Sequence, residues 1–122
     1  MVKGVGIDIE STQRIGRLLG RYDNPTLQLI FSEDELGRCR SADSPAQHLA
    51  VCFSAKEAMG KALGTGLATI DWNDIEADVQ RNQVVLTLHR TARRLAVDLG
   101  VSWWQARWSC WNDHVMVVVM IQ

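Results

Sequence analysis

Apolar residues alternate with polar ones near both ends of the chain, and in several stretches between them they recur with the spacing of a helix face. Strands are expected at about residues 2–9, 74–80, 83–89, 102–110 and 114–121. Helices are expected at about residues 12–21, in a short segment after Ser32, and at about residues 45–63 and 90–99. The order of these elements predicts an α+β fold over residues 1–122, in which one antiparallel sheet carries helices packed against it.

Capping and turn residues mark the ends of these elements. Ser32 with Glu35 forms a capping-box pattern, and Ser44-Pro45 with Gln47 is a second such pattern that opens the long helix. Asn24-Pro25 is expected to end the first helix, because proline disfavours a continuing helix before it. The four later strands are expected to pair as two hairpins, which turn at residues 81–82 and 112–113.

The C-terminal part of the long helix carries the most informative polar residues. Glu57 and Lys61 are spaced i, i+4 and therefore share one helix face. The segment Gly64-Thr65-Gly66 follows where the helix must stop, and glycine is the usual left-handed cap there. A carboxylate, an ammonium group and exposed backbone N–H groups together suit a magnesium–phosphate ligand. The alternative is a solvated surface pair, which contributes about 0.3–0.5 kcal/mol.

The first strand carries a second set of acidic residues. Val5, Ile7 and Ile9 share one face of this strand, so Asp8 and Glu10 both point to the other. Two carboxylates on one strand face repel each other unless a cation or water screens them, and Mg²⁺ prefers such oxygen ligands. The alternative is an edge strand that its charges keep soluble.

The two segments together resemble the phosphopantetheinyl transferases, and most closely the short, single-module type called holo-acyl-carrier-protein synthase. Near the N-terminus the matching residues are Gly4-Val5-Gly6-Ile7-Asp8-Ile9, followed by Arg14-Ile15. In the long helix they are Phe53-Ser54-Ala55-Lys56-Glu57-Ala58, followed by Lys61-Ala62-Leu63-Gly64-Thr65-Gly66. Each motif is moderately specific, and the pair in this order is highly specific.

The resemblance implies an enzyme that transfers the 4′-phosphopantetheine arm of coenzyme A to a serine of an acyl carrier protein, with adenosine 3′,5′-bisphosphate as by-product. It implies that Asp8 and Glu57 hold Mg²⁺, which Mn²⁺ is expected to replace, and that Glu10 adds a ligand directly or through water. Lys61 would contact the phosphates, and Gly64-Thr65-Gly66 would lie against the coenzyme. The group that removes the serine proton is left open between Glu57, Lys61 and a metal-bound water.

Three arginines follow the first strand. Arg14, Arg17 and Arg21 are spaced i, i+3, i+7 and share one side of the expected helix, opposite its apolar residues Ile15, Leu18 and Leu19. They form either a solvated face or a docking strip for an acidic partner, because guanidinium groups bind carboxylates in bidentate fashion. Acyl carrier proteins are strongly acidic, and the resemblance implies docking through Arg14 and Arg21, with Arg17 supported by its spacing alone.

Composition agrees with a cytoplasmic enzyme module. The 122 residues carry a net charge of −1, which gives no general attraction to nucleic acid or membrane. No apolar run reaches the ~20 residues of a membrane span, and acidic residues stand where a signal peptide needs an apolar stretch. Three cysteines without a CxxC spacing predict reduced thiols rather than a disulfide framework or a zinc site. Five tryptophans favour core and subunit contacts over base stacking.

Two features bear on activity and assembly. Cys52 stands where many relatives carry an arginine, and Arg107-Trp108-Ser109-Cys110 lacks the histidine that relatives carry near this point. These departures keep open an alternative function, a non-enzymatic homologue that binds carrier protein without transfer. The chain has no internal repeat to supply the second wall of a coenzyme site, so another copy of the chain is expected to supply it. The resemblance implies a homotrimer with sites between subunits. The segments 103–111 and 115–121 offer the sheet surface for it.

Overall fold

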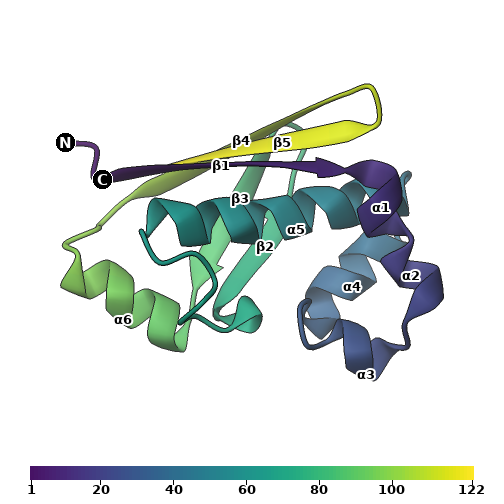
Figure 1. Ribbon diagram of the computed structural model, residues 1–122, viewed down its shortest axis with the longest axis horizontal. Helices are drawn as coiled ribbons and strands as arrows, with labels where there is room; N and C mark the ends of the chain where they lie inside the picture. Colours follow the sequence, from purple (N-terminus) through teal and green to yellow (C-terminus); the bar gives the residue numbers. More distant parts are fainter.

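The computed structural model describes residues 1–122 and contains a single five-stranded antiparallel sheet with the strand order β1-β5-β4-β3-β2 (Figure 1). The strands are β1 (Gly4–Ser11), β2 (Ile75–Val79), β3 (Gln83–Leu88), β4 (Trp104–Trp111) and β5 (His114–Ile121). The helices are α1 (Thr12–Gly16), α2 (Leu18–Arg21), α3 (Asn24–Leu27), α4 (Glu33–Arg40), α5 (Pro45–Ala62) and α6 (Arg90–Asp98), with a 3₁₀ turn, η1, at Trp72–Asp74. The predicted α+β class is confirmed.

Helix α5 lies across one face of the sheet and forms the centre of the core (Figure 1). Ser44 caps its N-terminus by accepting from the Gln47 N–H, and Pro45 occupies the first turn as its fixed φ favours. The helix ends before Gly64, whose φ of +86° is the left-handed cap that a glycine adopts without strain. Its small and apolar residues are buried along most of its length, which lets it pack on β1, β5 and β2.

The backbones of β1 and α5 lie in direct contact because the residues of β1 at the contact are glycines. A Cβ atom at Gly6 would lie 1.8 Å from the carbonyl oxygen of Ala58, and one at Gly4 would lie 2.3 Å from that of Ala62. The Ser54 hydroxyl then donates to the backbone carbonyl of Asp8 at 3.0 Å. These contacts hold the middle of β1 directly against the second half of α5.

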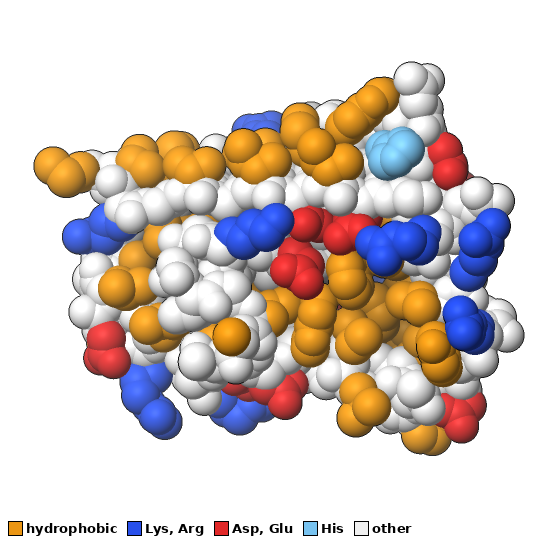
Figure 2. Space-filling model, in the orientation of Figure 1, with side chains coloured by type: hydrophobic (Ala, Val, Ile, Leu, Met, Phe, Trp, Pro, Cys, Tyr) orange, Lys and Arg blue, Asp and Glu red, His pale blue; other side chains and the backbone are white.

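The opposite face of the sheet has no helix on it. Val5, Ile7 and Ile9 are 54%, 50% and 51% exposed, and they stand beside Met120, Val118 and Met116 of β5. Figure 2 shows this set as an apolar row along the strand. The predicted alternation of β1 is therefore confirmed, but the carboxylate side is the one that faces the helix. Strand β1 does lie at the edge of the sheet, as the alternative interpretation supposed. The Asp8 carboxylate does not keep that edge soluble, however, because it points inward and is buried.

The segment after β1 differs from the expectation of one helix over residues 12–21. The chain forms α1 and α2, which meet at Arg17, and a further short helix, α3, where a break was expected. Glycine lowers helix propensity at position 16, but a Cβ there would lie 2.5 Å from that of Ala46, so Gly16 lets α1 pack closely on α5. Asp23 caps α3 by accepting from the Thr26 N–H, and proline is tolerated in a first helical turn.

Both predicted hairpins are present. The β4–β5 turn places Asn112 and Asp113 at φ values of +43° and +61°, a conformation that Asn and Asp tolerate. Trp104 and Trp108 lie on the core side and donate their indole N–H groups to the carbonyls of Leu86 and Gln80, each at 2.8 Å. The core role expected for these two tryptophans is confirmed. No helix of the protein is both long enough and apolar enough to cross a membrane.

Candidate functional site

Asp8 and Lys61 meet where β1 crosses α5. The Lys61 ammonium group donates to Asp8 Oδ1 at 3.1 Å and to the carbonyl of Ile7 at 3.0 Å. The Asp8 side chain is 9% exposed, whereas that of Lys61 is 48% exposed. Lys61 therefore neutralises a buried carboxylate while its outer part remains open to a ligand from solvent. The fold joins two residues that are 53 positions apart in the sequence.

Glu57 precedes Lys61 by one turn of α5 and is half-buried in the same place. Desolvation by burial raises the pKa of its carboxyl group, the negative charge of Asp8 raises it further, and Lys61 opposes both effects. The interaction with Asp8 shows that the two carboxylates lie within electrostatic reach of one another. Glu57 and Lys61 share one face of α5, as their spacing predicts. The salt bridge of Lys61, however, is formed with Asp8 and not with Glu57.

Glu10 lies at the end of β1 and has its own cation. The Arg14 guanidinium donates to the Glu10 carboxylate, a pair spaced i, i+4 in the sequence. Burial and then the negative charge of Asp8 raise the pKa of Glu10, whereas the hydrogen bond from Arg14 lowers it. Asp8 is thus the carboxylate that influences both Glu10 and Glu57. Figure 2 shows the acidic cluster below the apolar row of β1, with basic side chains on either side.

Asp8, Glu10 and Glu57 form an acidic cluster, and their carboxylates are oxygen ligands of the type that Mg²⁺ prefers. The Oδ2 atom of Asp8 is buried and has no hydrogen-bond partner, which is costly unless a ligand completes it. No group of three or more His, Cys, Asp or Glu side chains in the chain is placed so that it could hold a metal ion by itself. Mg²⁺ is commonly bound by one or two carboxylates and completes its shell with water and substrate phosphates, so a partial set of protein ligands is what such a site needs.

The turn after α5 is tightly folded. Gly66 has a φ of +59°, and its N–H donates to the carbonyl of Gly60, where a Cβ would lie only 3.0 Å from the Gly66 carbonyl carbon. The N–H of Gly64 donates to the carbonyl of Lys61. Of the three N–H groups expected to be exposed, only that of Thr65 has no acceptor in the chain. Hydrogen bonds to a coenzyme from this turn are therefore limited to Thr65 in this conformation.

Arg14, Arg17 and Arg21 surround a hollow beside the acidic cluster. This arginine hollow has a volume of about 380 Å³ and an apolar floor. The floor residues are Ile15, Leu18, Ile30 and Phe53. The three arginines line one hollow although the helix breaks at Arg17, but the expectation that they lie opposite the apolar side is wrong, because Ile15 and Leu18 line the same hollow. An apolar hollow with a basic rim suits an amphipathic acidic surface better than a small anion.

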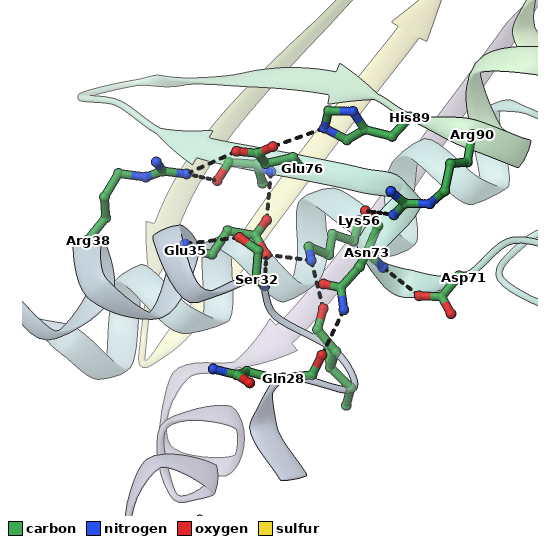
Figure 3. A network of polar contacts seen from close by, with 12 residues as sticks. Gln28, Ser32, Glu35, Arg38, Lys56, Asp71, Asn73, Glu76, His89 and Arg90 are labelled. Atoms are coloured by element: carbon green, nitrogen blue, oxygen red, sulfur yellow. Dashed lines mark hydrogen bonds and ion pairs between the residues drawn. The ribbon is translucent and has the colours of Figure 1, made fainter. Parts of the chain in front are cut away.

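Lys56 and Glu35 form a buried ion pair whose role the sequence did not reveal. Lys56 Nζ lies 2.6 Å from Glu35 Oε1 and 2.7 Å from the carbonyl of Ile30. The other oxygen of Glu35 accepts from the N–H of Ala77 at 2.7 Å, and the Ser32 N–H completes a capping box. Figure 3 shows Lys56 and Glu35 pointing toward each other. The sequence signal for this ion pair was Lys56 itself, because a lysine among the apolar residues of α5 needs a buried acidic partner.

Cys52 lies close to the buried Lys56–Glu35 ion pair. Burial, and next the Glu35 carboxylate, raise the pKa of the Cys52 thiol well above its ordinary value, so the thiol is neutral. Glu35 already has Lys56 as its counter-charge. A neutral residue at position 52 therefore leaves no buried charge without a partner. Cys110 is exposed on β4, and Nδ1 of His114 lies 2.8 Å from the carbonyl oxygen of Asn112 in the β4–β5 turn.

Comparisons with known proteins agree with this geometry. A family model described as the 4′-phosphopantetheinyl transferase superfamily matches residues 4–119. The chain belongs to the 4′-phosphopantetheinyl transferase superfamily. The holo-[acyl-carrier-protein] synthase of Vibrio parahaemolyticus is 37% identical over 103 residues, which cover 83% of this chain and 82% of that protein. The synthase of Alkalilimnicola ehrlichii is 34% identical over 125 residues, which cover 100% of this chain and 98% of that protein.

Solved structures of the superfamily share the fold over the whole chain. The crystal structure of the Neisseria meningitidis holo-[acyl-carrier-protein] synthase has a TM-score of 0.86 at 27% identity and covers 100% of this chain and 99% of that one. The Helicobacter pylori synthase in complex with coenzyme A has a TM-score of 0.79 at 25% identity and covers 97% and 99%. The match in length identifies this transferase as one of the short, single-module type.

Proposed function

We propose that the protein transfers 4′-phosphopantetheine from coenzyme A to a serine of an apo acyl carrier protein and releases adenosine 3′,5′-bisphosphate. The observation that carries this proposal is the buried, unpartnered Oδ2 of Asp8 beside Glu57 and Lys61, in a member of this superfamily. The relatives named above are holo-[acyl-carrier-protein] synthases, and one of them was crystallised with coenzyme A.

The acidic cluster would hold the metal in this reaction. Asp8 and Glu57 would bind Mg²⁺, with Mn²⁺ able to substitute, and Glu10 would add a ligand directly or through water. When bound, the cation would neutralise charge on the pyrophosphate of coenzyme A. Phosphoryl transfer of this kind depends on positioning and charge more than on covalent help from the protein.

Lys61 and the turn after α5 would place the coenzyme. The exposed part of Lys61 would contact the phosphates as a point charge, and Gly64, Thr65 and Gly66 would lie against the coenzyme with the Thr65 N–H free to donate. Glu57 and Lys61 are both candidates to accept the serine proton.

The arginine hollow would receive the carrier protein. Arg14 and Arg21, with Arg17 between them, would pair with acidic side chains of the carrier, and the apolar floor would contact a hydrophobic residue among them. The hollow adjoins Glu10 through Arg14, so a carrier bound there would present its serine near the acidic cluster. We place the reaction in the cytoplasm, with which the free thiols of Cys39, Cys52 and Cys110 are consistent.

A homotrimer would complete the sites. The uncovered sheet face presents contiguous apolar side chains from β1 and β5, and such patches mark interaction surfaces. In a cyclic trimer each subunit would contribute one surface and receive another. The acidic cluster and the turn after α5 would form one wall of each site, and the neighbouring subunit the other.

A mass measurement of an apo carrier protein tests the proposed function. After incubation with coenzyme A and Mg²⁺, the carrier should gain one phosphopantetheine unit, and a chelator or Asp8→Asn should prevent the gain. Val97→Ser is a matched control, because Val97 is an exposed residue of α6. The second candidate, a homologue that binds without transfer, is favoured by the missing histidine near Cys110. Carrier binding without a mass gain would establish that candidate instead.

A further inference from the structure

Arg14 belongs to two sites at once. Its side chain is 65% exposed and lines the arginine hollow, yet its guanidinium group is hydrogen-bonded to Glu10, whose side chain is only 11% exposed. Glu10 in turn interacts electrostatically with Asp8. One guanidinium group therefore joins the hollow to the acidic cluster.

The other arginines of the hollow have no such connection. Neither Arg17 nor Arg21 forms a salt bridge in the chain, and Arg21 lies over the ring of Tyr22, with 5.6 Å from its guanidinium carbon to the ring centroid. Glu10 has Arg14 as its single salt-bridge partner. Any competition for Arg14 must therefore change the charge balance at Glu10.

Two basic side chains neutralise the acidic cluster from different sides. Lys61 pairs with Asp8 on the side of the turn after α5, and Arg14 pairs with Glu10 on the side of the hollow. A dication in the cluster would supply the positive charge that Arg14 now supplies. Its presence would weaken the attraction between Arg14 and Glu10, because like charges near one carboxylate repel each other.

We propose that the Glu10–Arg14 pair is a latch that couples binding of an acidic protein in the arginine hollow to binding of a divalent cation in the acidic cluster. This inference rests on the proposed function for the identity of the partner, an acyl carrier protein. With the cation bound, Arg14 leaves Glu10 and becomes free for a carboxylate of the carrier. A carrier that takes Arg14 leaves Glu10 unneutralised, so the cluster attracts the cation more strongly.

Thermodynamic linkage makes this coupling reciprocal and measurable without turnover. The factor by which Mg²⁺ tightens carrier binding must equal the factor by which the carrier tightens cation binding. Arginine suits the task because its charge is permanent and its several N–H donors can bond to one carboxylate or another. The latch would favour the complex in which both cation and carrier are present.

Carrier affinity with and without Mg²⁺ tests the latch. Fluorescence anisotropy would follow a labelled acidic carrier whose acceptor serine is replaced by alanine, at constant ionic strength and without coenzyme A. We expect about fivefold tighter binding or more with Mg²⁺ for the parent protein. Glu10→Gln should bind the carrier in both conditions as tightly as the parent protein does with Mg²⁺, since Arg14 is then free in both.

Arg21→Gln is the matched control. It removes a charge from the hollow but not from the latch, so carrier binding should weaken in both conditions while the Mg²⁺-dependent ratio stays that of the parent. In the reverse direction, Mn²⁺ titrations followed by electron paramagnetic resonance should show tighter binding when the carrier is present, by the same factor. Circular dichroism checks that each variant is folded.

Two outcomes would contradict the latch. An unchanged ratio in Glu10→Gln, or no effect of Mg²⁺ on the parent, would show that Arg14 does not couple the two sites. If the latch fails while the wild-type carrier still gains phosphopantetheine, the proposed function stands alone. If no carrier binds under any condition and none gains mass, both the latch and the proposed function are wrong.

Discussion

Asp8, Glu10 and Glu57 are carboxylates that the fold keeps close together and partly away from water. For Glu57 and Glu10, burial is the largest cause of a raised pKa, and the negative charge of Asp8 is the second. Ionised, these groups oppose folding of the metal-free protein, and a bound cation would remove that cost. The proposed site would therefore lower the stability of the metal-free protein, as active sites commonly do.

The pH dependence of stability follows from the raised pKa of Glu57. A group whose pKa is higher in the folded state stabilises the fold below its unfolded value, here about 4.5, and loses that contribution as the pH rises through the folded value. Glu57→Gln should therefore raise the melting temperature of the metal-free protein by about 1–3 °C at pH 7.5 and change little near pH 4. Calorimetry at both pH values checks this. A lower melting temperature at pH 7.5 would contradict it.

Lys56 and Lys61 show how position decides the role of one residue type. Lys56 is fully buried and paired with Glu35, whereas Lys61 is half-exposed beside Asp8. Lys56→Met should lower the free energy of unfolding by about 3–5 kcal/mol, because it leaves the Glu35 charge buried without its cation. Lys61→Met should cost less, about 1–3 kcal/mol, because it leaves the Asp8 carboxylate without its cation at a place where the half-exposed Lys61 lets water approach. Urea denaturation of both variants compares them, and equal losses would contradict the assignment.

Among the helices and strands, the contact between β1 and α5 brings the residues of the candidate site together. Glycines let the strand backbone touch the helix backbone, and the Ser54 hydroxyl fixes the position of Asp8 along the strand. Every candidate metal ligand lies on one of these two elements. A shift of the strand by a few tenths of an ångström would change the distance between Asp8 and Glu57.

Gly6→Ala tests this contact. The new Cβ would meet the Ala58 carbonyl, so β1 must move away, at a cost of about 3 kcal/mol and with weaker Mg²⁺ binding. Gly37→Ala is the matched control, since nothing lies within 4 Å of that position in α4, and it should stabilise the protein by about 0.5–1 kcal/mol. Denaturation and metal titration measure both effects. Unchanged metal affinity in Gly6→Ala would separate the contact from the site.

At the scale of the whole molecule, the sheet has one covered face and one open face. The open face carries Val5, Ile7 and Ile9 beside partly buried apolar residues of β5. Burial of such a patch contributes roughly 25 cal/mol for each Å² of apolar surface removed from water, which favours association. The proposed trimer would use this face.

Ile7→Asp should dissociate the trimer. The charge would lie in the middle of the buried apolar patch, where it has no partner, and the transfer activity should fall with the loss of shared sites. Light scattering across a dilution series measures the assembly, with activity followed in parallel. Val97→Asp is the control, because Val97 is an exposed residue of α6, outside the apolar row, and its variant should keep the parent mass. A fully active monomer would refute shared sites.

The sequence by itself determined the elements and the chemical types of the site. The capping box at Ser32 and Glu35, the long helix that opens at Ser44, and both hairpins depend on neighbours within a few positions, so local patterns predict them. The two motifs around Asp8 and Glu57 identified the superfamily, which the comparisons confirm. The break at Arg17 involves the packing of Gly16 on Ala46, which no local pattern shows. Helix α3 has local signals, the Asp23 cap and a proline in the first turn, but Asn24-Pro25 was interpreted only as a break.

Only the tertiary structure decided which groups meet. The pairing of Lys61 with Asp8, and of Lys56 with Glu35, joins residues far apart in the sequence, and adjacent helix positions point about 100° apart. Alternation along β1 predicted two faces, but it could not tell that the charged face would be the buried one. That choice depends on Gly6 admitting the backbone of α5, and on a second apolar surface left open on the other side. Burial and partner are properties of the packed chain, so they appear only once the helix lies on the sheet.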